Sequence, residues 1–150
     1  MKISKITDYL YVSGQPRAKH ASTIQDLDIG LIISMVGQIR PPKIYRQPPF
    51  NTLWLPTFDT FLTPIPIKTL QRGVEAALPI IESGGRILTH CRVGRHRGVA
   101  MGAAILISQG YGAEAAMTLI KENRPIADPD CWYIKRRIVK FETHWREQNK

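Results

Sequence analysis

Cysteines and long apolar runs are both scarce in this sequence. Its two cysteines, Cys91 and Cys131, are too few for the disulfide framework of a small secreted protein, so we expect a reducing compartment, by default the cytoplasm. No apolar stretch approaches the roughly 18 residues of a membrane-spanning helix, and the N-terminus lacks the pattern of a signal peptide. Repeats, low-complexity tracts and linkers are also absent, so we predict one domain over residues 1–150.

Acidic residues are outnumbered by basic ones. The chain has 12 aspartates and glutamates against 21 lysines and arginines, a formal net charge of +9 at pH 7. This balance favours an anionic partner, either a phosphorylated protein or a small phosphoester, with contact to an acidic surface as a further option. Nucleic acid is the least supported partner, because the sequence has no aromatic stacking motif and no recognition-helix signature. The sequence carries no information on the oligomeric state.

Short apolar runs predict strands, and apolar residues at helical spacing predict helices. The predicted strands cover residues 8–13, 31–36, 52–55 and 86–89. The predicted helices cover residues 18–27, 67–83, 99–107, 113–123 and 130–147. The proline-rich region 37–50 and residues 56–66 are predicted to be loops. Strands mixed with helices, with the helices clustered toward the C-terminus, predict a three-layer α/β domain.

The most informative segment is the short stretch from His90 to Gly98, which lies between a predicted strand and a predicted helix. In a strand–loop–helix unit the loop amides converge on one point, and the helix N-terminus adds positive potential there, so the segment predicts an anion site. A thiol at this point, that of Cys91, should ionise to a thiolate nucleophile. Arg97 would offer a planar fork that fits two phosphate oxygens.

The segment from His90 to Arg97 resembles the His-Cys-x5-Arg signature of the cysteine-dependent protein tyrosine phosphatases, in particular of their dual-specificity branch. Residues 6–16 and 27–35 resemble the opening strands and the central strand of that branch. Arsenate reductases and low-molecular-weight phosphatases share Cys-x5-Arg, but there the cysteine lies near the N-terminus. Cys91 lies past mid-chain with an acid before it, which favours the dual-specificity branch. The resemblance implies a mostly parallel sheet of about five strands flanked by helices.

The resemblance also implies a reaction that needs no metal or cofactor, in which phosphomonoesters are hydrolysed through a phosphocysteine on Cys91. Asp59 is the only carboxylate between Asp28 and Glu75 and follows a predicted strand, so it is the candidate for the general acid that later activates water. His90 would orient the loop through hydrogen bonds. The residues expected to bind the phosphate are Arg92, Val93, Gly94, Arg95, His96 and Arg97.

Gly98 departs from the family pattern, which usually has serine or threonine there to stabilise the departing thiolate. We therefore expect slow hydrolysis of the intermediate, and a catalytically weak, phosphate-binding pseudophosphatase is an alternative function. Arg92 and Arg95 add two cations to the loop, a pattern found in family members that act on inositol phosphates or phosphoinositides, which is a second alternative. Both side chains could instead point into solvent or bind carboxylates of the protein.

The segment from Asn123 to Asp130 aligns with the place where related enzymes brace the phosphate loop. Asp128 or Asp130 could supply that brace, although an N-cap of the last helix explains Asp130 equally well. The neighbouring Cys131 is expected to pack in the interior, with a redox partnership with Cys91 as the less favoured alternative.

Overall fold

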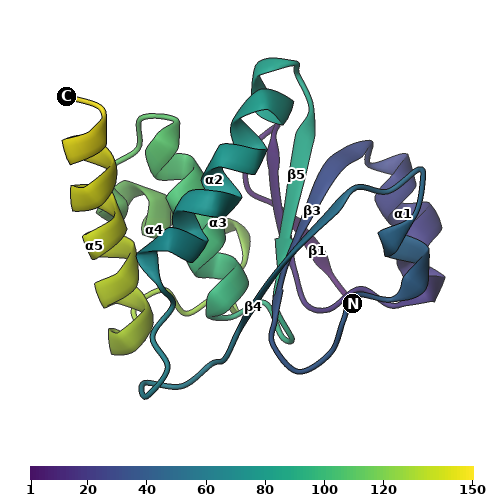
Figure 1. Ribbon diagram of the computed structural model, residues 1–150, viewed down its shortest axis with the longest axis horizontal. Coiled ribbons are helices and arrows are strands. Elements are labelled where there is room, and N and C mark those ends of the chain that lie inside the picture. The colour runs from purple at the N-terminus through teal and green to yellow at the C-terminus, as the bar shows by residue number, and fades with distance from the viewer.

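A five-stranded sheet forms the centre of the molecule, which the computed structural model describes over all of residues 1–150 (Figure 1). The strand order is β1-β2-β5-β3-β4, and all neighbours are parallel except the antiparallel pair β1 and β2. The strands are β1 (Ile3–Lys5), β2 (Leu10–Ser13), β3 (Ile29–Val36), β4 (Thr52–Thr57) and β5 (Arg86–His90). The predicted mostly parallel sheet of about five strands is confirmed.

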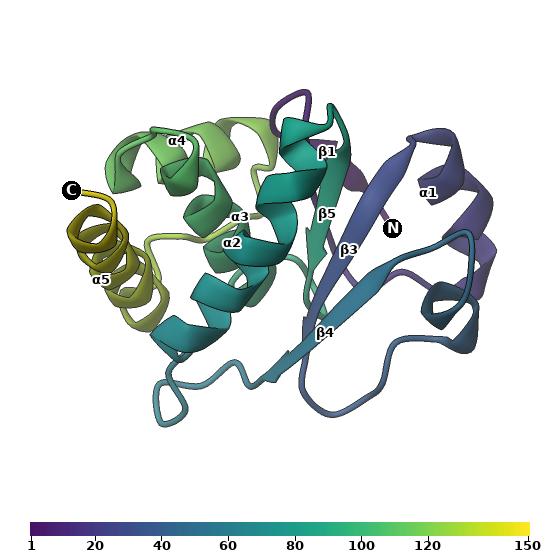
Figure 2. The same ribbon diagram turned by 45° about the horizontal axis from the view of Figure 1, so that its top comes forward.

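Helices cover both faces of the sheet unequally, which gives the three predicted layers. The helices are α1 (Ala21–Asp26), α2 (Ile67–Glu82), α3 (Arg97–Ser108), α4 (Ala113–Asn123) and α5 (Trp132–Gln148). Figure 2 shows α2 to α5 on one side of the sheet and α1 on the other. None of these helices is long and apolar enough to cross a membrane.

Two hydrophobic cores follow from the alternation of side chains along the central strands. Leu31, Ile33 and Ile87 point into a core of 29 buried residues under α2 to α5. Ile32 and Leu88 point the opposite way, into a core of six residues beneath α1. Within the larger core α3 is buried along almost its whole length, because it packs against the sheet and against α2, α4 and α5. The central strands are therefore apolar on both faces, as a covered parallel sheet requires.

Several element boundaries differ from the predicted ones. Strand β4 continues through Pro56 to Thr57, because β4 lies at the sheet edge, where a residue without an N–H is tolerated. Helix α2 runs through Pro79, as predicted, because the proline ring faces solvent near the helix end. The helix predicted over residues 18–27 is a short 3-10 turn followed by α1, and a second 3-10 turn (Lys43–Arg46) lies in the proline-rich region.

Candidate active site

The loop between β5 and α3 lies at the carboxyl edge of the sheet, where parallel strands commonly place their binding sites. The backbone amides of residues 92–96 donate no hydrogen bond to any protein group, so they are free to bind a ligand. Beside this loop is a cavity of about 310 Å³, and its lining residues are Gln38, Asp59, Cys91, Arg92, Val93, Arg95, His96 and Arg97. Most of the residues predicted from the sequence therefore meet at one cavity.

Cys91 and Arg97 are both buried, at 3% and 4% exposure. The Arg97 side chain is fixed by Nη1, which donates to the carbonyl oxygens of Thr57 at 2.7 Å and Met35 at 3.2 Å, at the ends of β4 and β3. Its Nε is buried without a hydrogen-bond partner. An unpartnered buried donor costs about 1–3 kcal/mol, so an anion accepting from Nε would remove a penalty that the free protein carries.

His90 supports the loop from within the core. Its Nδ1 lies 3.3 Å from the carbonyl oxygen of Cys91, and burial lowers its pKa to about 4. The positive charge of Arg97 lowers the pKa further, against the opposing effect of the bond to Cys91. The ring is consequently neutral at physiological pH, which fits the predicted structural role better than proton transfer.

Two glycines give the loop its shape. Gly94 has a φ of +76°, and a Cβ there would stand 2.6 Å from the carbonyl oxygen of Ser13, so both conformation and space require glycine. A Cβ on Gly98 would stand 3.0 Å from the backbone of His90 and 3.1 Å from the nitrogen of Cys91. A hydroxyl-bearing residue at position 98 would thus need the neighbouring backbone to shift by a few tenths of an ångström.

Arg124, immediately after α4, braces the loop from behind and was not identified from the sequence. The residue is 4% exposed. Its Nε donates to the carbonyl oxygen of Gly94 at 2.9 Å, and its Nη2 donates to that of Val93 at 3.0 Å. Its Nη1 reaches Ser4 Oγ at 3.0 Å and so connects the loop to β1. The sequence places Arg124 in the expected bracing segment, but only the fold shows that this residue forms the brace.

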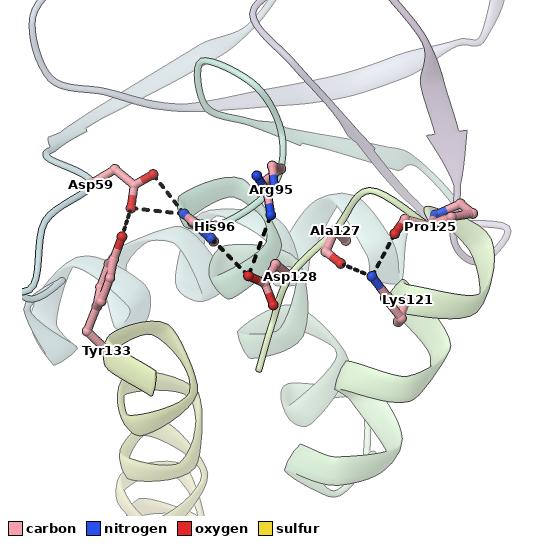
Figure 3. A network of polar contacts seen from close by, with 8 residues as sticks. All are labelled: Asp59, Arg95, His96, Lys121, Pro125, Ala127, Asp128 and Tyr133. Carbon is pink, nitrogen blue, oxygen red and sulfur yellow. Dashed lines mark hydrogen bonds and ion pairs between the residues drawn. The ribbon is translucent and has the colours of Figure 1, made fainter. Parts of the chain in front are cut away.

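Asp59 lies on the loop after β4 and faces the phosphate loop, as predicted (Figure 3). Its carboxylate accepts from His96 Nδ1 at 2.8 Å and from the hydroxyl of Tyr133 at 2.7 Å. Burial, the largest influence, raises the pKa of Asp59, but the two hydrogen bonds and the charges of His96 and Arg97 outweigh it and lower the pKa below its ordinary value. Burial and the same bond to Asp59 raise the pKa of Tyr133, so the tyrosine stays protonated as the donor.

Helix α5 holds the Asp59 loop at two points. Tyr133 reaches Asp59 from its first turn, and one turn later Arg137 Nε donates to the carbonyl oxygen of Ile65 at 2.8 Å. Tyr133 had no sequence signal, because the helical pattern of α5 alone explains an aromatic residue there. Its contact with Asp59 spans 74 residues of sequence.

Asp128, between α4 and α5, also braces the phosphate loop, which is the role that the sequence suggested for Asp128 or Asp130. Its backbone N–H donates to the carbonyl oxygen of Arg95 at 2.9 Å, and its Oδ2 lies 3.7 Å from Arg95 Nη2 and 3.5 Å from His96 Nε2. Asp130 instead extends toward solvent, 3.8 Å from the ammonium of Lys135. The N-cap prediction for Asp130 is wrong: α5 begins one residue later, after Cys131, and no side chain caps it.

The remaining cations of the loop differ in their surroundings. The side chain of Arg95 is 53% exposed and partly neutralised by Asp128, whereas Arg92 is exposed and forms no ion pair. Val93 is exposed as well, at 56%. Arg92 is therefore the loop cation that is fully available to a second anionic group on a ligand.

The sequence matches the family described as "Dual specificity phosphatase, catalytic domain" over residues 10–143. It is 31% identical over 134 residues to the protein-tyrosine-phosphatase MKP1 of Arabidopsis thaliana, covering 87% of this chain and 16% of that protein. The chain spans 16% to 43% of the length of three curated relatives that it matches.

Two solved structures share the fold. Human DUSP28 has a TM-score of 0.85 and 21% identity, over 96% of this chain and 95% of that one. PTPMT1 in complex with PI(5)P has a TM-score of 0.86 and 19% identity, over 99% of each chain. The family match over residues 10–143 and the 31% identity to the Arabidopsis thaliana phosphatase show that the chain belongs to the family of dual specificity phosphatase catalytic domains.

Proposed function

We propose that this chain is a cysteine-dependent phosphatase that hydrolyses phosphomonoesters, phosphotyrosine among them. The observation that carries the proposal is the set of unused donors around a buried thiol: the free amides of residues 92–96 and the unpartnered Nε of Arg97, next to Cys91. Such preorganised donors stabilise the charge of a transferring phosphoryl group. Membership of the family supports the same reaction.

In this mechanism the thiolate of Cys91 attacks phosphorus, and the bond to the leaving oxygen breaks while Asp59 gives that oxygen a proton. The product of this step is a phosphocysteine. The Asp59 carboxylate then takes a proton from water as the water attacks phosphorus, which releases inorganic phosphate and regenerates the thiolate. Arg97 and the loop amides supply the positive charge, so these steps draw on the chain's own residues.

The contacts of Asp59 imply an acidic pH optimum. His96 and Tyr133 stabilise its ionised form, yet the first step needs its protonated form. The fraction of protein with a protonated Asp59 consequently falls as pH rises above its lowered pKa. The rate should decline toward neutral pH, most steeply for substrates whose leaving oxygen is strongly basic.

The test is the pH–rate profile for p-nitrophenyl phosphate in the presence of EDTA. The wild type should give a bell-shaped acidic optimum, Cys91→Ser should be inactive, and Asp59→Asn should lose the basic limb. Asp59→Asn should also lose about 10²–10⁴-fold on phenyl phosphate, a substrate that depends on the acid. Activity that persists in Cys91→Ser would refute the mechanism. Phosphate binding without turnover in the wild type would support the pseudophosphatase alternative.

Exposed cations at the rim favour a second candidate, the hydrolysis of inositol phosphates or phosphoinositides. Arg92 lines the cavity without an ion-pair partner, so it can bind a second phosphate of such a ligand. We expect Arg92→Ala to lower turnover of an inositol polyphosphate more than that of phosphotyrosine. Arg95→Ala, at a position already paired with Asp128, is the matched control. An unchanged substrate ratio in Arg92→Ala would exclude this candidate.

A further inference from the structure

Three side chains with metal-binding atoms meet on the side of His96 that faces away from Asp59. They are His96, Asp128 and Cys131, and their ligand atoms all lie within 4.8 Å of one another. His96 comes from the phosphate loop, and the other two come from the segment between α4 and α5. Figure 3 shows the His96 ring between the two carboxylates, with Asp59 on one side and Asp128 on the other.

The two nitrogens of His96 are used differently. Because the Asp59 carboxylate can only accept, Nδ1 carries the hydrogen at that 2.8 Å contact. Nε2 is therefore the ring nitrogen left to bind a metal ion, which would take the place of a proton there. Nε2 is buried and has no hydrogen-bond partner, and its nearest charged neighbour, Asp128 Oδ2 at 3.5 Å, is also an acceptor. A buried nitrogen beside a carboxylate and a thiol, three groups that can each ligate a metal, is suited to a cation.

We propose that His96 Nε2, a carboxylate oxygen of Asp128 and Cys131 Sγ bind a divalent transition metal, foremost zinc, with water as the fourth ligand. Imidazole and thiolate donors select zinc over calcium or magnesium, which prefer oxygen ligands alone. Cys131 is a free thiol, and it gives up its proton to solvent as the zinc–sulfur bond forms.

The geometry needs little rearrangement. Ligands about 2.0–2.3 Å from a tetrahedral zinc stand roughly 3.3–3.8 Å apart, so the widest separation in the cluster has to close by about 1 Å. Side-chain rotation of Cys131 supplies a movement of this size without a change in the backbone. Arg95, which lies 3.7 Å from Asp128 and is half-exposed, can swing into solvent as the metal replaces it.

Asp59 would be the outer partner of this site. Histidine ligands of zinc characteristically donate their other N–H to a carboxylate, which fixes the ring, and His96 already makes this bond to Asp59. The site therefore extends from Cys131 through His96 to the proposed general acid. Zinc here would hold the His96 ring and the Asp59 carboxylate in their present positions and takes no part in the phosphoryl transfer described above.

The experiment measures metal binding in a Cys91→Ser background, which removes the competing thiol and does not depend on phosphatase activity. Cobalt(II) titration should give one equivalent with a near-ultraviolet thiolate-to-cobalt band, and the band should vanish on adding Cys131→Ser. Zinc affinity, measured against a chromophoric chelator, should fall at least about 10-fold in Asp128→Asn and about 10–100-fold in Asp59→Asn. Asp130→Asn, a solvent-facing carboxylate of the same segment, should leave the affinity unchanged.

Two further measurements make the result decisive. Arg95→Ala should tighten zinc binding, because it removes the cation that competes for Asp128. Circular dichroism melting of each variant without metal excludes unfolding as the cause of a lost site. A thiolate band that survives Cys131→Ser, or equal affinities for Asp128→Asn and Asp130→Asn, would overturn the proposal. An absence of stoichiometric binding in the Cys91→Ser protein would overturn it as well.

Discussion

Replacing Arg124 by methionine tests whether this residue holds the phosphate loop in place. Methionine keeps most of the apolar stem but removes the hydrogen bonds of 2.9 and 3.0 Å to Gly94 and Val93 and the bond of 3.0 Å to Ser4. Hydrogen bonds to a charged group contribute about 1.5–3 kcal/mol each, and the carbonyl of Gly94 would be left buried without a donor. Relief from burying the guanidinium offsets part of this loss.

The net destabilisation should therefore be about 2–4 kcal/mol, measured from urea unfolding curves. For a chain of this size, that loss lowers the melting temperature by roughly 4–16 °C. Binding of orthovanadate, a phosphate analogue, should weaken in the folded variant, because the carbonyl groups that orient the loop lose their donor. Arg124→Lys keeps the charge without the planar fork and should recover only a small part of both losses. A loss below about 0.5 kcal/mol, with unchanged vanadate affinity, would refute the bracing role.

The contacts around Cys91 lead to three further predictions. Tyr133→Phe removes a hydrogen bond to the ionised form of Asp59, so the pKa of Asp59 should rise. The basic limb of the pH–rate profile should then move to higher pH. If the limb does not move, the protonation of Asp59 does not cause it. The pKa of His90 is about 4 in the folded protein, below its ordinary 6.5, so the unfolded chain binds this proton more readily. The free energy of unfolding should therefore fall by up to about 3 kcal/mol as the pH drops from 6.5 to 4. Unfolding curves of His90→Gln should show a weaker pH dependence in that window than the wild type. In stopped-flow assays the wild type should show a product burst, and Gly98→Ser should abolish the burst and raise the steady rate. The close Cβ contact should lower the free energy of unfolding of this variant by about 1–3 kcal/mol. A linear time course in both proteins would contradict the prediction.

The strand–loop–helix unit was predictable because its chemistry is contiguous in sequence. Cys91 and Arg97 have a fixed spacing between an apolar strand and an apolar helix, and neither needs a distant residue to be recognised. Asp59 could be found because the chain offers no other carboxylate over a long region, and the parallel sheet brings the loop that follows β4 to the edge where Cys91 lies.

The residues that sequence reasoning missed act through long-range contacts. Arg124 reaches a loop 30 residues earlier, and Tyr133 reaches an aspartate 74 residues earlier, so nothing near either residue in sequence marks its role. Local rules also failed where tertiary position overrides them. Pro56 was predicted to begin a loop, but it lies within β4 because that strand is at the edge of the sheet.

The attachment of the Asp59 loop to α5 affects how the protein becomes active during synthesis. The thiol of Cys91 and its cradle belong to elements that are made before α5, whereas Tyr133 and Arg137 belong to the last helix. The loop that carries Cys91 is thus synthesised before the residues that hold the proposed proton donor. Helix α5 also adds Ile134, Ile138 and Phe141 to the larger core, so docking of this one helix would complete the core and position Asp59 in the same step.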